Sequence, residues 1–234
     1  MKEVFAHRGD TVNHVENTYN SIIEIDKISS NELNIGIEFD IQLTNDDKLI
    51  CFHDKNMKRL FNKDIVIEEM NTTDIKIKDI CYLNDILNYY KDNKNIILNI
   101  EVKCFNLNKL KKKRLCNKII DLVKKYECNF IISSFNREIV NYLYKNKNNF
   151  LVGYIIDNFD NNEYNKIKNN IDYLICNKSI DKNIILEISK NKKILIFTLY
   201  NKKNQNIKYD EYLIKYFYEN KNIGFITDNI YKFI

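Results

Sequence analysis

The amino-acid sequence predicts an α/β fold, a (β/α)₈ barrel in which eight parallel strands alternate with helices. Short apolar runs alternate with longer amphipathic stretches along the chain, which is typical of a parallel sheet with helical crossovers. The short runs are rich in Ile and Val, as expected for strands buried on both faces. At 234 residues the chain is long enough for one barrel with a large core. We therefore predict a single domain over residues 1–234.

Nine segments have the character of strands, one more than an eight-stranded barrel needs. They are residues 4–7, 35–43, 49–53, 96–103, 130–135, 151–156, 173–176, 194–199 and 224–227. Helices are expected between most of these segments, at residues 17–28, 81–92, 107–127, 136–147, 160–170, 180–191 and 208–220.

A β-hairpin extension after the second strand explains the additional strand. Only five residues separate the second and third segments, too few for a helical crossover. Several of them are Asn or Asp, which favour turns. A turn centred between Asp46 and Asp47 would place His53 opposite Asp40. The barrel then keeps eight parallel strands, and a doubly wound open sheet is the alternative architecture.

The composition indicates a globular protein and argues against nucleic acid or zinc as partners. The basic run at residues 108–114 is interpreted as a solvated helix face, because no stacking aromatic residues are interleaved with it. The six cysteines include no Cys-x-x-Cys pair, which argues against a zinc site. The sequence shows no signal peptide and no apolar stretch of spanning length, so we expect a cytoplasmic protein with reduced thiols.

Three acids and a lysine stand out because they occupy alternate positions within two apolar strand segments. Glu38 and Asp40 form one such pair, and Glu101 and Lys103 form the other. Residues i and i+2 of a strand point to the same face. Charged side chains on a buried face cost free energy unless something compensates them. A hard divalent cation would compensate the carboxylates, and an anionic substrate would compensate the lysine.

A histidine stands at the end of the first strand segment, and an arginine follows it. His7 ends it, and Arg8 and Gly9 come next. Arginine binds phosphate in a bidentate manner, and glycine allows a tight turn close to a ligand. The active sites of such barrels lie at the carboxyl ends of the strands. By the predicted strand boundaries, these ends carry His7, Asp40, Lys103, Ser134 and Asp228.

Other polar and aromatic features receive a structural interpretation. His14 is assigned to a loop, and Asp54 and Arg59 are interpreted as loop residues that form ion pairs. The aromatic-rich stretch at residues 209–218 has a spacing that favours packing against the core.

Several blocks of the sequence resemble the glycerophosphodiester phosphodiesterase family. In chain order they are Ala6-His7-Arg8-Gly9 with Glu16-Asn17-Thr18, residues 37–44, residues 49–54 with Arg59, and residues 99–103. Weaker similarities lie at residues 133–135, 197–199 and 226–228. Phe197 stands where the family usually carries tryptophan, and Tyr200 stands where asparagine is usual. The resemblance covers almost the whole chain, and these two departures concern the apolar part of the substrate pocket.

The resemblance implies an enzyme that hydrolyses glycerophosphodiesters, such as glycerophosphocholine or glycerophosphoethanolamine, to glycerol 3-phosphate and an alcohol. It also implies one divalent cation, Mg²⁺ or Ca²⁺. The matched positions are Glu38, Asp40 and Glu101 for the metal, His7 and His53 for acid–base catalysis, and Arg8 and Lys103 for the substrate phosphate.

The sequence leaves several alternatives open. The nucleophile is either water or the substrate's own 2-hydroxyl, and neither histidine is distinguished as the acid. Phospholipase C-like or lysophospholipase D activity on a membrane lipid is an alternative, which predicts an exposed apolar rim or amphipathic helix at the mouth. A non-catalytic phosphate-binding barrel is another. The alcohol head group and the oligomeric state are not specified.

Overall fold

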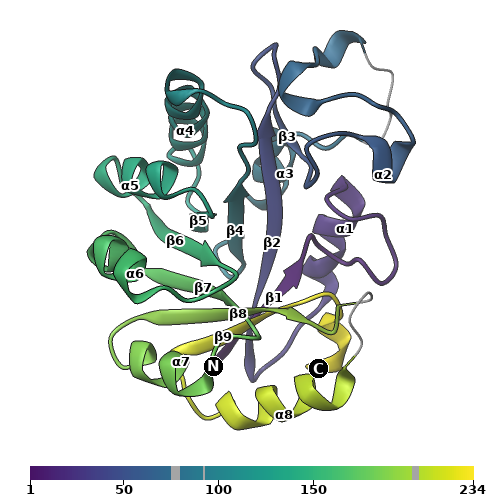
Figure 1. Cartoon of the computed structure of the whole chain (residues 1–234). Coiled ribbons are helices and arrows are strands. Elements are labelled where there is room, and N and C mark those ends of the chain that lie inside the picture. Colours follow the sequence, from purple (N-terminus) through teal and green to yellow (C-terminus); the bar gives the residue numbers. More distant parts are fainter. Residues whose placement is uncertain (75–79, 92, 202–205) are drawn as a thin grey trace.

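The computed structural model, which describes residues 1–74, 80–91, 93–201 and 206–234, is a closed barrel of eight parallel strands. The strands are β1 Lys2–His7, β2 Leu33–Leu43, β4 Ile97–Val102, β5 Asn129–Ser134, β6 Phe150–Ile156, β7 Tyr173–Asn177, β8 Lys193–Leu199 and β9 Ile223–Thr227. Strand β1 pairs with both β2 and β9, which closes the sheet (Figure 1). The predicted (β/α)₈ barrel is therefore confirmed, and the open-sheet alternative is wrong.

Helices connect the strands and cover the outside of the barrel (Figure 1). They are α1 Tyr19–Ile23, α2 Lys58–Phe61, α3 Leu83–Tyr90, α4 Lys109–Val123, α5 Arg137–Lys145, α6 Asn161–Ile167, α7 Lys182–Ser189 and α8 Ile207–Phe217. Short 3₁₀ turns occupy Glu24–Lys27, Ile67–Glu69, Thr72–Asp74, Lys168–Asn170 and Ile230–Lys232. None of the helices in the described part of the chain is long and apolar enough to cross a membrane.

The predicted helices are present, but most are shorter than expected. The predicted helix at 17–28 begins only at Tyr19, because the Thr18 side chain caps it by accepting from the Ser21 backbone N–H. Asn17 has a positive φ of 57° and so lies outside the helix. Residue 92, which ends the predicted helix at 81–92, lies outside the described residues.

The hairpin after β2 is present, but its predicted register is wrong by one residue. Strand β3, Leu49–Cys51, pairs antiparallel with β2. The Phe52 backbone N–H donates to the Asp40 carbonyl at 3.1 Å, so Phe52 lies opposite Asp40 in place of His53. The reason is a three-residue loop centred on Asp46, whose last residue, Asp47, has a left-handed φ of 61°.

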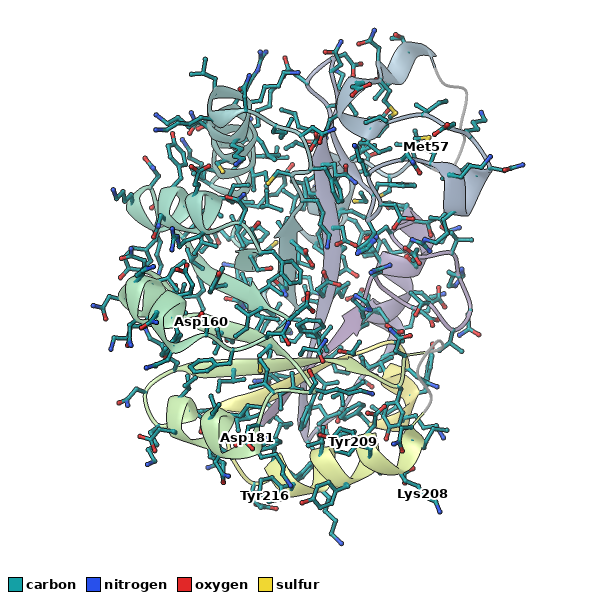
Figure 2. All side chains as sticks on the ribbon, in the orientation of Figure 1. Met57, Asp160, Asp181, Lys208, Tyr209 and Tyr216 are labelled. Atoms are coloured by element: carbon teal, nitrogen blue, oxygen red, sulfur yellow. The ribbon has the colours of Figure 1, made fainter. Side chains whose placement is uncertain are left out.

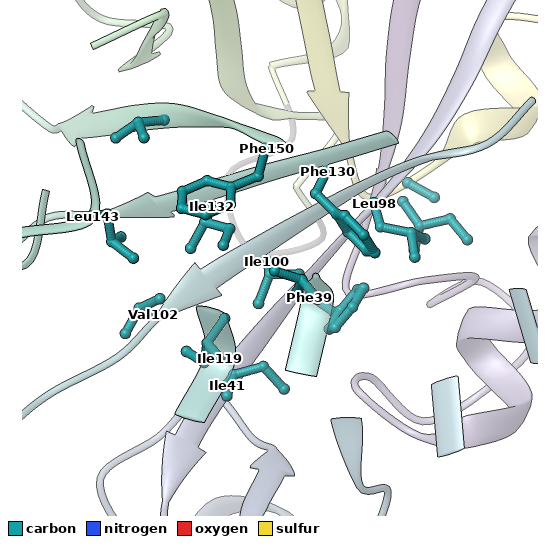
Figure 3. Close-up of a cluster of buried hydrophobic side chains, with 14 of the residues drawn as sticks. Phe39, Ile41, Leu98, Ile100, Val102, Ile119, Phe130, Ile132, Leu143 and Phe150 are labelled. Carbon is teal, nitrogen blue, oxygen red and sulfur yellow. The ribbon is translucent and has the colours of Figure 1, made fainter. Parts of the chain in front are cut away.

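Alternate residues of the same strands build an apolar layer outside the sheet and a polar lining inside it. Figure 3 shows Phe39 and Ile41 of β2 beside Ile100 and Val102 of β4, with Ile119 of α4 close by. Because side chains alternate between faces, the intervening acids of β2 and β4 point into the barrel. A separate interior cluster fills the barrel, made of Phe5, Ile131, Ile155, Tyr173, Ile175, Leu195 and Ile226.

The tyrosines of the stretch 209–218 do not pack against the core as the sequence suggested. The buried residues of α8 are Asp210, Leu213 and Phe217, which already fill its inner stripe. Tyr209, Tyr212 and Tyr216 are between 37% and 47% exposed. Figure 2 labels Tyr209 and Tyr216 on α8. Tyrosine rings that are exposed on a helix are common at interfaces, because they combine an apolar body with a polar hydroxyl.

Lys2 ties the closing seam of the barrel to the end of α8. Its Nζ donates to three carbonyl oxygens, those of Phe217 at 2.9 Å, Asn220 at 2.6 Å and Ile223 at 2.7 Å. Burial lowers the pKa of Lys2 to about 8, so at pH 7 the ammonium group supplies a donor for each carbonyl.

Replacing Lys2 by methionine should destabilise the barrel strongly. Methionine keeps most of the apolar volume but removes three hydrogen bonds from a charged donor, each worth roughly 1.5–3 kcal/mol. The Phe217 and Asn220 carbonyls keep the backbone N–H groups of Asn220 and Ile223, each at 3.1 Å. We therefore expect Lys2→Met to lower the free energy of unfolding in urea by about 3 kcal/mol or more. The exposed Lys208 of α8 is the control, since Lys208→Met should stay within about 0.5 kcal/mol. Equal effects of the two changes would contradict the role given to Lys2.

Candidate active site

A cluster of three buried carboxylates lies inside the barrel at the carboxyl ends of β2 and β4. Glu38 and Asp40 come from β2 and Glu101 comes from β4, where it pairs in register with Asp40. One oxygen of each carboxylate lies within 4.8 Å of the others, and all three residues are buried. The predicted metal-binding residues are thus brought together by the parallel pairing of two strands.

Two cations balance much of this negative charge. The Nζ atom of Lys103 pairs with Glu101 and lies 3.2 Å from Asp40 Oδ1. The Nε atom of Arg8 lies 3.4 Å from Asp40 Oδ2, and the Arg8 backbone N–H donates to Glu38 Oε2 at 3.1 Å. Burial opposes ionisation of Asp40, but Lys103 and Arg8 outweigh it and hold the pKa of Asp40 below its usual range.

Glu38 remains the uncompensated member of the cluster. Burial and the charge of Asp40 raise the pKa of Glu38 to about 8, so the three acids do not all ionise together at neutral pH without a further cation. The Oε1 atom of Glu38 has no hydrogen-bond partner among the described residues. Three oxygen ligands of this kind suit Mg²⁺ or Ca²⁺, and the residues present therefore fit a divalent cation.

A tight turn after β1 positions Arg8 over the cluster. Arg8 has a positive φ of 59° and Gly9 follows with a φ of 82°, a conformation that strongly favours glycine at the second position. A Cβ atom on Gly9 would lie 2.5 Å from the backbone carbon and oxygen of Ser21. Nearby, Asn17 Nδ2 donates to Asp40 Oδ2 at 2.8 Å and fixes the orientation of that carboxylate.

Each of the two histidines at the mouth is held by a carboxylate on Nδ1. His7 Nδ1 pairs with Asp228, which follows β9, and His53 Nδ1 lies 2.7 Å from Asp54 Oδ1. Proton exchange with a ligand then falls to the Nε2 atoms. His7 Nε2 lies 3.8 Å from Glu38 Oε2, which places this histidine beside the carboxylate cluster.

The two histidines have different environments. Burial opposes a charge on His7, but the hydrogen bond that His7 donates to Asp228 and the charge of Glu38 outweigh it and raise the pKa of His7. Burial lowers the pKa of His53, and the positive charge of Lys103 adds to that effect.

Ion pairs join the loops that carry the histidines. Arg59 Nε donates to Asp54 Oδ2 at 2.6 Å, and its Nη1 donates to Glu16 Oε2 at 2.9 Å. Glu16 also accepts from Arg8 Nη1 at 2.7 Å. The predicted ion pair of Asp54 and Arg59 is confirmed, but Arg59 lies in the short helix α2 and not in a loop.

Sequence reasoning assigned no site role to Asp228, Asn17, Glu16 or Asp54, although the structure places them next to the predicted site residues. These residues lie in or beside the sequence blocks that resemble the phosphodiesterase family, and this position was the available sign that they belong to the site. Asp228 and Asn17 contact partners that lie 221 and 23 positions away, so those contacts required the fold. Asp54, in contrast, is the chain neighbour of His53.

A cavity of about 360 Å³ opens at this site. One part of its wall is charged, and the other part is mostly apolar. The charged part comprises His7, Arg8, Glu38, His53, Glu101 and Lys103, and the remaining part includes Asn99, Phe135, Ile155, Ile175, Phe197, Thr198 and Ile226. All predicted site residues except Asp40 line this cavity, and Asp40 lies directly behind Lys103 and Arg8.

Comparison of the chain with known proteins identifies the family to which it belongs. The model of the Glycerophosphoryl diester phosphodiesterase family matches residues 7–232. The chain belongs to this family. The resemblance noted in the sequence blocks is thereby confirmed over almost the whole chain.

Individual relatives are similar over shorter stretches. A glycerophosphodiester phosphodiesterase from Caldanaerobacter subterraneus is 34% identical over 113 residues, covering 43% of this chain and 44% of the relative. One from Bacillus altitudinis is 31% identical over 116 residues, covering 44% of this chain and 46% of the relative. The chain thus aligns with less than half the length of these family members.

Solved structures share the fold over the full chain. A glycerophosphodiester phosphodiesterase from Thermotoga maritima has a TM-score of 0.75 at 22% identity and covers 98% of this chain and 96% of its own. A phosphodiesterase from Oleispira antarctica, in complex with the product sn-glycerol-3-phosphate, has a TM-score of 0.75 at 18% identity, covering 97% and 93%.

Replacing Glu38 by glutamine should separate metal binding from folding. With a pKa of about 8, Glu38 carries a proton at pH 7 when no cation is present, and glutamine resembles that neutral form. We expect metal-free Glu38→Gln to keep its free energy of unfolding within about 1 kcal/mol of the starting protein.

Thermal unfolding with chelator, Mg²⁺ or Ca²⁺ tests this expectation. A cation at 100 times its dissociation constant stabilises a protein by about 2.7 kcal/mol, and the variant should lose this gain. Asp157→Asn, a change in the same cavity outside the cluster, should retain it. Undiminished stabilisation of Glu38→Gln would show that the cluster is not the cation site.

Proposed function

We propose that the protein is a metal-dependent glycerophosphodiester phosphodiesterase that acts as a single catalytic domain. It would hydrolyse substrates such as glycerophosphocholine or glycerophosphoethanolamine to glycerol 3-phosphate and an alcohol. The observation that carries this proposal is the convergence on one cavity of three carboxylates, two carboxylate-bound histidines and two cations. The product bound to the Oleispira antarctica phosphodiesterase supports the same class of substrate.

Glu38, Asp40 and Glu101 would hold Mg²⁺ or Ca²⁺. When bound, this cation supplies neutralisation of the charge that develops on the phosphoryl oxygens. Arg8 and Lys103 border both the cluster and the cavity, and they would bind the remaining phosphate oxygens. Arginine suits this role through its planar donors, and lysine contributes a point charge.

His7 and His53 would act as the acid–base pair. One Nε2 atom removes the proton from the nucleophile, which is water or the 2-hydroxyl of the substrate, and the other protonates the leaving alcohol. Asp228 and Asp54 hold the rings through Nδ1, which fixes the tautomer needed for this exchange. Arg59 would position His53 indirectly, because it holds Asp54.

The exposed tyrosines of α8 favour a second candidate, phospholipase C-like or lysophospholipase D activity on a membrane lipid. The rings of Tyr209, Tyr212 and Tyr216 are partly exposed, and such amphipathic rings suit a membrane interface. Lys182 Nζ lies 4.6 and 4.8 Å from the ring centroids of Tyr212 and Tyr216 and so covers part of this surface. Flotation with lipid vesicles tests this reading. Lipid hydrolysis together with flotation, but without turnover of water-soluble diesters, would support it over the first proposal.

Replacing either catalytic histidine should nearly abolish turnover. We expect His7→Ala and His53→Ala each to lower kcat roughly 10²- to 10⁴-fold, the usual contribution of a general acid or base. The measurement is choline or ethanolamine release from the corresponding glycerophosphodiester. Near-native turnover in both variants would make the acid–base assignment wrong. The control is His14→Ala, a loop histidine outside the cavity described above, which should retain activity.

Chelation gives an independent test of the metal. Release should stop with chelator and return with Mg²⁺ or Ca²⁺, since the carboxylates alone repel the anionic phosphate. Turnover that persists in chelator would contradict metal dependence. Phosphate binding without turnover under any metal condition would favour a non-catalytic phosphate-binding barrel.

A further inference from the structure

The two exposed phenylalanines of the chain share one hollow at the mouth of the barrel. Of the 13 phenylalanines, all of which the structure describes, only Phe105 and Phe135 are exposed, at 44% and 41%. Phe105 lies in the loop between β4 and α4, and Phe135 lies in the loop between β5 and α5. Both line a hollow of about 220 Å³ next to His53 and Lys103. Single exposed apolar side chains need no explanation, but a group of them at one place marks a binding surface.

A buried acid fixes the loop that carries Phe105. Glu68 is 4% exposed, and its two carboxylate oxygens accept from the backbone N–H groups of Phe105 and Asn106 at 2.7 and 2.8 Å. Hydrogen bonds to a charged acceptor are stronger than neutral ones. The exposed ring therefore belongs to an ordered loop, and it loses little further conformational freedom when a partner covers it.

A third apolar side chain lies in the first turn of α4, directly after this loop. Leu110 is the most exposed large apolar side chain among the described residues, at 77%. Helix α4 packs against the barrel through buried residues that begin only at Leu115, so Leu110 takes no part in the core. Apolar side chains of this size favour removal from water. Phe105, Leu110 and Phe135 together form an apolar rim at one side of the mouth.

Lysines in the first turns of α4 add positive charge beside the apolar rim. Lys112 and Arg114 each pair with a carboxylate. The other three lysines of the basic run, Lys109, Lys111 and Lys113, have no salt bridge to any residue that the structure describes. A groove of about 270 Å³ between α4 and α5, which lie side by side (Figure 1), continues this surface with four lysines and one carboxylate. The surface therefore attracts an extended negative charge.

Exposed apolar side chains next to lysines of this kind fit an anionic lipid bilayer. At such a bilayer, ammonium groups lie at the level of the lipid phosphates and apolar side chains enter the boundary of the acyl chains. A nucleic acid would supply the negative charge, but its phosphate backbone offers no apolar layer for Phe105 and Leu110. The combination of the two features therefore favours the bilayer.

We propose that the apolar rim, together with Lys109, Lys111 and Lys113, docks the mouth of the barrel onto an anionic lipid bilayer. This inference goes beyond the proposed function, since docking requires neither the divalent cation nor turnover. It also differs from membrane binding through the tyrosines of α8, because β4 and β8, which precede α4 and α8, lie on opposite sides of the closed sheet (Figure 1).

Flotation with vesicles tests the docking surface. The vesicles contain phosphatidylcholine and phosphatidylglycerol in equal parts, and phosphatidylcholine alone is the neutral comparison. We expect Lys109→Gln/Lys111→Gln/Lys113→Gln to lower the partition coefficient for anionic vesicles roughly 100-fold, since each lysine near an anionic surface contributes about fivefold. Phe105→Ser and Leu110→Ser should each lower it about tenfold. Binding of the unaltered protein should weaken as salt rises, because salt screens the lysines.

Matched variants control for net charge and for exposed apolar surface. Lys125→Gln/Lys215→Gln/Lys221→Gln removes the same charge from three exposed lysines toward the opposite end of the barrel. Leu151→Ser changes an exposed leucine near the start of β6. Both controls should float like the unaltered protein. Phe135 is left unchanged, because it also lines the cavity of the candidate active site.

Several outcomes would overturn the proposal. The unaltered protein might fail to float with anionic vesicles, or the rim and lysine variants could float as well as it does. An equal loss in the control triple variant would show attraction by net charge alone. Lysine-dependent retardation of DNA in a gel, without flotation, would assign the lysines to nucleic acid. Because the assay contains no glycerophosphodiester, absence of turnover leaves these results unchanged, and failure of the proposed function is thereby distinguishable.

Discussion

The compensation of negative charge inside the barrel is the constraint on which the rest of the site depends. Three carboxylates lie within 4.8 Å of one another in a buried position, an arrangement that costs free energy unless cations accompany it. Lys103 and Arg8 supply part of that compensation. The high pKa of Glu38 shows that they do not supply all of it. The remaining negative charge is what the proposed divalent cation would compensate.

The barrel meets this constraint with the same strands that form its core. Along β2 and β4, alternate side chains build the apolar layer under the helices and the charged lining of the cavity (Figure 3). Closure of the sheet at β1 and β9 then brings Asp228 beside His7, although 221 positions separate them in the chain. A parallel barrel therefore makes site geometry a consequence of strand pairing, so a change in register would disturb core and site together.

The two parts of the cavity wall differ in chemistry. Most of the charged residues lie on or next to β1, β2 and β4, while isoleucines and Phe197 line the remaining part. In the proposed function, the charged part would bind the phosphate of the diester. Phe197 replaces the tryptophan usual in the family, yet it still lines the cavity. Tyr200 stands apart from that wall and packs against Phe233, with ring centroids 6.0 Å apart. Of the two departures noted in the sequence, therefore, only Phe197 lies on the cavity wall.

The sequence by itself determined the strand order, the hairpin and the charged residues that converge on the cavity, because alternation within strands and the position of strand ends are local properties of the chain. Only the tertiary structure decided the hairpin register. The sequence shows several turn-forming residues in a row, but it does not show that the loop has three residues or that Asp47 takes the left-handed conformation. It also decided which carboxylate holds each histidine, which face of α8 is exposed, and which polar atoms in the cavity stay unpaired. Apart from Asp54, which is the chain neighbour of His53, these features depend on contacts between residues distant in the chain. Such contacts exist only once the barrel has closed.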